Sequence, residues 1–166
     1  MKFKLNENVS APLIFRGVED TPHYTKYFGG KFYADNPMDA SNYGDIIEVY
    51  SITQKAKLFK YASSIDFCED SGFMENYFEV VSTLSNGEFS ILGDAIDAYI
   101  YNGENPNLGL SIVQGVAKLM LEKLGYDGAE WSNEDDMIPH QFQIWNYDVL
   151  THIETISEVN ANNKYM

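Results

Sequence analysis

The sequence predicts an α+β domain in which short strands alternate with helices. Two segments rich in apolar, β-branched and aromatic residues, 11–18 and 45–51, are typical of strands. The segment 107–124 carries apolar residues at helical spacing and ends before Gly125, which is typical of an amphipathic helix. Hydrophobic residues make up 45% of the 166 residues, enough for one core, so we expect a single domain over 1–166.

The first part of the chain contains three expected strands and one short helix. Pro12 and Gly17 bound the apolar run of the first strand. A helix over 39–43 lies between the second and third strands, and Asp35 or Asn36 can cap it. The three strands are 11–18 (APLIFRGV), 31–34 (KFYA) and 45–51 (DIIEVYS).

The second part of the chain combines expected helices with three further strands. Residues 71–84 and 90–101 carry apolar residues at helical spacing, and Asn86-Gly87 separates them, so we expect two helices before the one at 107–124. We expect the Asn-rich residues 157–166 to form a frayed tail. The expected strands are 126–131, 141–145 and 149–156.

The charge excludes several partner classes. The chain has 11 Lys and Arg against 25 Asp and Glu, a formal charge of −14. Such a chain repels nucleic-acid phosphates and anionic lipid, so we expect neither nucleic-acid nor membrane binding. The basic residues Lys55, Lys57 and Lys60 are too few to reverse this. A basic protein partner remains compatible with the charge.

Cysteine, histidine and glycine patterns indicate neither a metal centre nor a phosphate loop. Cys68 is the single cysteine, so a reducing, cytoplasmic setting is expected, and no apolar run has the length of a membrane span. His23, His140 and His152 are scattered, so we expect no metal site. The two common glycine-rich nucleotide-binding patterns are missing.

Three residues of the first part point to a ligand site. Arg16 ends an apolar strand, and a cation in that position is costly unless it meets a carboxylate or a phosphate. Tyr33 ends the next strand and Tyr43 lies on the short helix, so the two rings are suited to face one pocket and stack on a flat group.

These residues belong to an ordered series of motifs that resembles the ADP-ribosyltransferase superfamily. The series begins with Arg16-Gly17 and continues with GKFYAD at 30–35 and ASNY at 40–43. It ends with LGYDG at 124–128 and QFQIWN at 141–146. The resemblance covers residues 11–156, with 55–105 unmatched and expected to be a helical, family-specific insertion.

The resemblance implies a split β-sandwich of short strands with flanking helices, which transfers ADP-ribose from NAD to an acceptor. By matched position, Arg16 would contact the phosphates or a ribose of NAD, and Gly17 would let the nicotinamide amide approach the backbone. Tyr43 would stack on nicotinamide and Tyr33 would close the other side. Ser41 lies in the matched cofactor-binding segment.

The catalytic acid departs from the family pattern. The position that carries a glutamate in the family is Gln141 here, and a glutamine has no charge to stabilise the cationic transition state. Three explanations are open. The carboxylate comes from elsewhere, with Glu130, Glu134 and Asp136 as candidates; Gln141 is an inactivating substitution; or the chain is a fold relative that binds without turnover.

The acidic segment 132–136 (SNEDD) has two interpretations. It is either a solvated turn or, through Glu134, Asp135 and Asp136, a contact for a basic acceptor. The resulting functional hypothesis is a cytoplasmic mono-ADP-ribosyltransferase that modifies a protein with a basic surface, in the setting of a phage or bacterial effector. The alternative is a non-catalytic acidic protein that mimics nucleic acid and blocks a basic partner.

Overall fold

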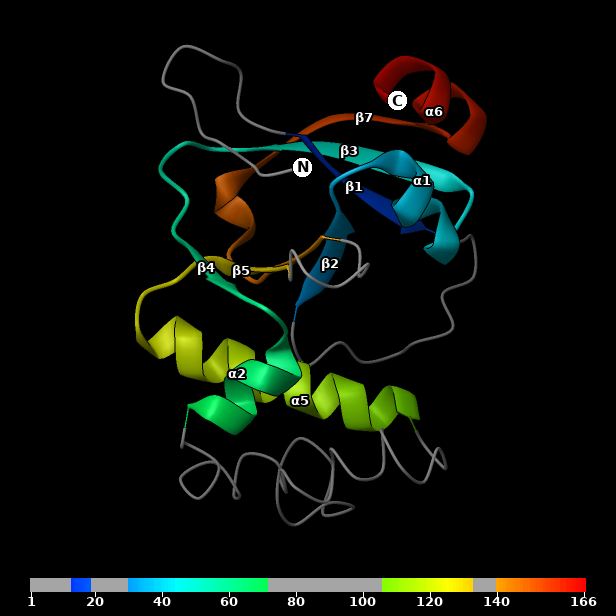
Figure 1. Cartoon of the computed structure of the whole chain (residues 1–166). Coiled ribbons are helices and arrows are strands. Elements are labelled where there is room, and N and C mark those ends of the chain that lie inside the picture. Colours follow the sequence, from blue (N-terminus) through cyan, green and yellow to red (C-terminus); the bar gives the residue numbers. More distant parts are fainter. Residues whose placement is uncertain (1–12, 19–29, 72–105, 133–139) are drawn as a thin grey trace.

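The computed structural model describes residues 13–18, 30–71, 106–132 and 140–166 (Figure 1). These residues form a mixed sheet with helices and so confirm the α+β class. The strands are β1 (Leu13–Val18), β2 (Lys31–Ala34), β3 (Ile46–Ile52), β4 (Leu58–Tyr61), β5 (Gly128–Trp131), β6 (Gln141–Ile144) and β7 (Leu150–Ser157). The helices are α1 (Pro37–Ala40), α2 (Ser64–Asp70), α5 (Pro106–Lys123) and α6 (Glu158–Tyr165), with short 3-10 turns η1 (Ser41–Tyr43) and η4 (Tyr147–Val149).

Seven strands lie side by side in the order β4-β5-β6-β2-β1-β3-β7. The β4–β5 pair at one edge is parallel, and the other pairs are antiparallel. The expectation that residues 55–105 form a helical insertion is wrong for its first part, because Leu58–Tyr61 is a strand of this sheet. Residues 72–105, and with them most of the expected helices 71–84 and 90–101, lie outside the described residues.

The helices pack on one face of the sheet, at its two ends. In Figure 1, α2 and α5 lie together near β4 and β5, whereas α1 and α6 lie near β1, β3 and β7. We call this side the helix face; it includes Phe15, Ala34 and Ala129. The other side, the far face, buries an apolar cluster that includes Tyr33 and Phe142.

The first and second strands separate soon after they meet. β1 pairs with β3 over its whole length, and β2 does so with β6. Between β1 and β2, however, the register consists of one pair in the described residues, Phe15 opposite Ala34. The segments Arg16–Val18 and Lys31–Tyr33 carry no further register pair and therefore diverge within the one seven-stranded sheet.

The C-terminal residues form a helix, so the expected frayed tail at 157–166 is wrong. The Ser157 side chain caps α6 by accepting a hydrogen bond from the Asn160 amide at 3.3 Å. Ala161 is fully buried in the core on the helix face, and the Tyr165 ring packs edge-on against Phe15 with centroids 5.3 Å apart. Burial of these two side chains holds the end of the chain in place.

Local signals place the short helix after β2 and the end of α5. Asn36, one of the two expected caps, accepts a hydrogen bond from the Asp39 amide at 2.8 Å and so begins α1. Gly125 follows α5 with a φ of 87°, the left-handed conformation that ends many helices. None of the helices in the described ranges combines the length and apolar character needed to cross a membrane.

Candidate functional site

Charged and aromatic side chains form a row across the far face. Cross-strand partners lie on the same face of a sheet, so pairing places one side chain from each strand in this row. On one side of the β1–β2 divergence, the row contains Lys60, Glu130, Phe142 and Tyr33. On the other side it contains Arg16 and Glu48, which lie opposite each other on β1 and β3.

Arg16 meets a carboxylate, as a cation on an apolar strand requires. Its Nη1 donates to Glu48 Oε1 at 3.1 Å, and both side chains are about three-quarters buried. Glu48 also accepts a hydrogen bond from the Tyr50 hydroxyl. Burial first, and then the charge of Glu48 and this hydrogen bond, raise the pKa of Tyr50. Glu48 carries no motif of its own, so inspection of the sequence missed it.

Tyr33 is a core residue. It is 3% exposed, and its ring packs edge-on against Tyr50 with centroids 5.5 Å apart. Burial, followed by the neighbouring Tyr50, raises the pKa of its hydroxyl, whereas the charge of Arg16 acts in the opposite direction. The Tyr33 ring is therefore already packed against protein in the core.

Gly17, Ser41 and Tyr43 lie together on the helix side of β1. A Cβ at Gly17 would stand 1.9 Å from the Ala40 carbonyl oxygen, so a glycine is required for η1 and the end of α1 to approach β1 this closely. The Ser41 hydroxyl donates to the Met38 carbonyl at 2.6 Å. Tyr43 is 63% exposed, which leaves its ring accessible to a ligand.

Gln141 and Glu130 lie on opposite faces of the sheet. Gln141 pairs with Ala34 and Trp131 and therefore belongs to the helix face. Glu130 pairs with Phe142 and belongs to the far face, which also carries Arg16. The structure thus places these two candidate positions for the catalytic group on different sides. Glu134, Asp135 and Asp136 lie outside the described residues.

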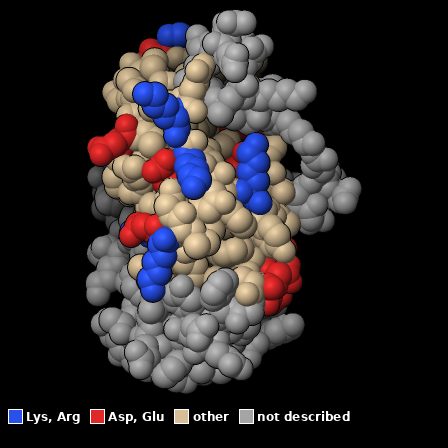
Figure 2. All heavy atoms as spheres, turned by 90° about the vertical axis from the view of Figure 1, so that its left-hand side faces the viewer, with Lys and Arg blue, Asp and Glu red and all other residues tan. Residues whose placement is uncertain are grey.

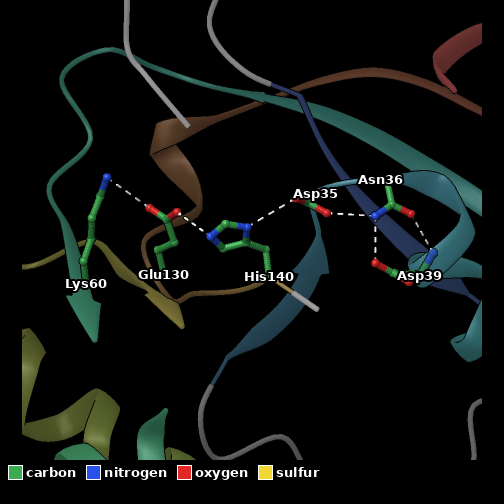
Figure 3. Close-up of polar contacts among 6 residues, drawn as sticks. All are labelled: Asp35, Asn36, Asp39, Lys60, Glu130 and His140. Carbon is green, nitrogen blue, oxygen red and sulfur yellow. Dashed lines mark hydrogen bonds and ion pairs between the residues drawn. The ribbon is translucent and has the colours of Figure 1, made fainter. Parts of the chain in front are cut away.

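His140 joins two carboxylates that are far apart in the sequence, as Figure 3 shows. Its Nε2 lies 3.3 Å from Glu130 Oε1, and its Nδ1 lies 3.4 Å from Asp35 Oδ2. The side chain of His140 is 14% exposed. Scattered histidines gave no sequence signal for this contact, because it depends on the pairing of β2, β5 and β6.

The contacts continue from Asp35 to the N-terminus of α1. Asn36 Nδ2 donates to Asp35 Oδ1 at 2.8 Å and to Asp39 Oδ2 at 2.7 Å (Figure 3). The Asn36 side-chain oxygen accepts from the Asp39 amide. One chain of polar contacts therefore links the β4–β5 edge to the helix that precedes Ser41 and Tyr43.

Glu130 is the most buried charged group in this series of polar contacts. It is 3% exposed, and its Oε2 has no hydrogen bond among the described residues, although Lys60 Nζ lies 3.3 Å away. This ion pair contributes little, because the Lys60 side chain is 63% exposed and solvent screens its charge. Of the two side chains that contact the Glu130 carboxylate, His140 is the more buried.

The described residues contain no group of three or more His, Cys, Asp or Glu side chains arranged to hold a metal ion.

The net charge of the described residues is closer to zero than that of the whole chain. Segments 1–12, 19–29, 72–105 and 133–139 carry 12 of the 25 acidic and three of the 11 basic residues, which leaves 8 − 13 = −5 for the rest. Figure 2 accordingly shows Lys and Arg side chains interspersed with Asp and Glu on the face that it displays.

Cys68 is expected to be unreactive in the folded protein. It is 1% exposed on α2, and burial, aided by the charge of Glu69, raises the pKa of its thiol to about 12. A shift from 9.0 to about 12 lowers the thiolate fraction about 1000-fold at a given pH. With a disulfide reagent at pH 8, we expect rapid labelling in denaturant and very slow labelling without it; rapid stoichiometric labelling of the folded chain would contradict this.

Comparison with known proteins adds little to the geometry. No family model matches the chain, and no curated protein matches it. Among solved structures, one described as the crystal structure of an anti-CRISPR protein is similar, with 18% sequence identity and a TM-score of 0.44. The alignment covers 87% of this chain and 94% of that one.

Proposed function

We propose that the chain is an ADP-ribosyltransferase that takes NAD as its substrate and modifies a protein acceptor. The observation that carries this proposal is the divergence of β1 and β2 directly beside Arg16-Gly17. Strands that diverge at this point within the sheet support the split β-sandwich that the motif resemblance implies. The matched residues of β1, β2 and η1 lie at or next to this divergence.

Two of the matched residues suit parts of the NAD molecule. A guanidinium has five N–H donors, so the contact of Arg16 Nη1 with Glu48 does not saturate it, and a phosphate is a suitable second acceptor. The exposed Tyr43 ring is suited to stack on nicotinamide. Tyr33 supports the site from the core and does not offer a free ring face. Gly17 contributes through its lack of a side chain, which lets the end of α1 and η1 pack closely against β1.

The transfer breaks the bond between C1′ of the ribose and the nicotinamide nitrogen, and nicotinamide leaves with the bonding electrons. An acceptor nucleophile then bonds to C1′ and loses its proton. A preorganised carboxylate stabilises the positive charge that develops on the ribose. We assign this role to Glu130, which lies on the same face of the sheet as Arg16; Gln141 lies on the opposite face and receives no role at that ribose.

The test measures transfer from labelled NAD to proteins of a cell lysate. The wild type is expected to label an acceptor, and Arg16→Ala to lower the rate at least about 100-fold, because the anionic substrate loses its cation. Arg16→Lys, which keeps the charge but not the planar fork, should retain part of the activity. Lys55→Ala removes an exposed cation from a turn and serves as the matched control.

Three outcomes separate the alternatives. Absence of labelling by the wild type, together with salt-sensitive binding to a basic protein, would replace the enzyme with the acidic binder. Full activity of a folded Arg16→Ala variant would remove Arg16 from the site. A large gain of transfer activity in the Gln141→Glu variant would identify position 141 as that of the catalytic acid. It would contradict the role that we assign to Glu130.

A further inference from the structure

We propose that His140 is a positioning residue that couples the buried Glu130 carboxylate to the N-terminus of α1. The coupling itself depends only on the folded protein. Its consequence for catalysis rests on the proposed function, because it assumes that Glu130 acts on the ribose. Nothing in the motif series includes His140, and the argument comes from its contacts alone.

The geometry of the imidazole makes it a bridge between two segments. One nitrogen lies 3.3 Å from Glu130 on β5, and the other lies 3.4 Å from Asp35, which directly follows β2. Both nitrogens donate only when the ring is protonated, and a neutral ring offers a proton to one carboxylate at a time. In either protonation state the ring lies between the two carboxylates and joins their segments.

Glu130 depends on such a partner more than an exposed acid would. A carboxylate that is 3% exposed has lost most of its hydration, and removing one partner from a buried pair leaves an uncompensated charge. Lys60 supplies less compensation because its side chain is 63% exposed. His140, with a side chain 14% exposed, lies 3.3 Å from Oε1 and so restricts the orientation of the carboxylate.

At the other end, the bridge reaches the segment that packs on Gly17. Asp35 accepts from Asn36, and Asn36 caps α1 through the Asp39 amide. The helix continues into η1, which holds Tyr43 beside β1. A change in the charge of Glu130 should therefore alter the environment of the α1 cap through His140.

The first experiment follows backbone amide chemical shifts in solution and needs no substrate. Glu130→Gln is introduced into the wild type and into His140→Gln. We expect the substitution to shift the backbone amides of residues 36 and 38–44 in the wild type and to lose most of that effect in His140→Gln. Equal shifts in both backgrounds, with both proteins folded, would overturn the coupling.

Lys60→Gln is the matched control. It removes a cation from the same carboxylate, but at a solvated position outside the bridge. We expect residues 36–44 to respond much less to Lys60→Gln than to His140→Gln. An equal response would mean that the charge of Glu130 reaches α1 through space, and the bridge would be rejected.

The second experiment measures labelled transfer with the same variants. His140→Gln should lower kcat about tenfold with little change in KM for NAD, a loss on the scale of one polar contact to a charged group. In the Glu130→Gln background, the same change should have almost no effect, because His140 acts through Glu130. If the fold-decreases in kcat of the two single variants multiply in the double variant, His140 does not position Glu130.

The two experiments fail in different ways. A wild type that transfers no ADP-ribose while its amide shifts are coupled through His140 would reject the proposed function and retain the bridge. An active wild type without this coupling would retain the function and reject the bridge.

Discussion

Replacing Gly17 with alanine is expected to lower the free energy of unfolding by about 3 kcal/mol or more, at the upper end of overpacking costs. The new methyl group would stand 1.9 Å from the Ala40 carbonyl oxygen and 3.1 Å from the Gly44 nitrogen. Both neighbours are backbone atoms, so no side-chain rotation relieves the clash. Denaturant titration of the two proteins measures the difference.

Gly125→Ala is the matched control for this prediction. Gly125 has a φ of 87° and no atom within 4 Å of an added Cβ, so the substitution tests backbone conformation without steric conflict. We expect a cost of about 1 kcal/mol, typical of a residue forced into the left-handed region. If Gly17→Ala costs no more than Gly125→Ala, the packing of η1 and α1 on β1 is looser than the structure indicates.

Replacing Gln143 with leucine is expected to cost about 3 kcal/mol. Gln143 is fully buried; its side-chain oxygen accepts from Trp131 Nε1 at 2.9 Å, and its Nε2 donates to the Gln114 carbonyl at 2.9 Å. Leucine has a similar size but leaves the indole N–H and that carbonyl without this partner inside the core, each at a cost of about 1–3 kcal/mol. Denaturant titration again measures the loss.

A double-mutant cycle with Trp131→Phe separates the hydrogen bond from general packing. Phenylalanine lacks the N–H, so Gln143→Leu in that background no longer leaves a buried indole donor unpaired. We expect the double variant to lose at least 1 kcal/mol less stability than the sum of the losses in the two single variants. Strict additivity would show that the Trp131–Gln143 bond contributes nothing specific.

Segments with strong local signals were predicted well. β2 and its expected range coincide at 31–34, and β1, β3 and α5 agree with the expected strands and helix apart from their ends. The period of apolar residues and the preferences of Asn at an N-cap and Gly at a C-terminus act within a few residues. Such signals can therefore be read without knowledge of the partner segments.

Segments that depend on distant partners were not predicted. β4 has only four residues, and it becomes a strand because β5, about 70 residues later, pairs with it. The helix at 158–165 is polar and Asn-rich, and it is held by Ala161 and Tyr165 against the sheet. In both cases tertiary contacts outweigh weak local propensity.

The residue pattern alone indicated an anionic partner for Arg16, because a cation at the end of an apolar strand is costly unless it is paired. That this partner is Glu48, 32 residues away, and that Glu130 and Gln141 lie on opposite faces, follows only from the folded structure. Residues alternate along every strand, but which residues share a face across strands depends on pairing register. The bridge from Glu130 through His140 to Asp35 arises in the same way, from three strands that meet only when the chain is folded.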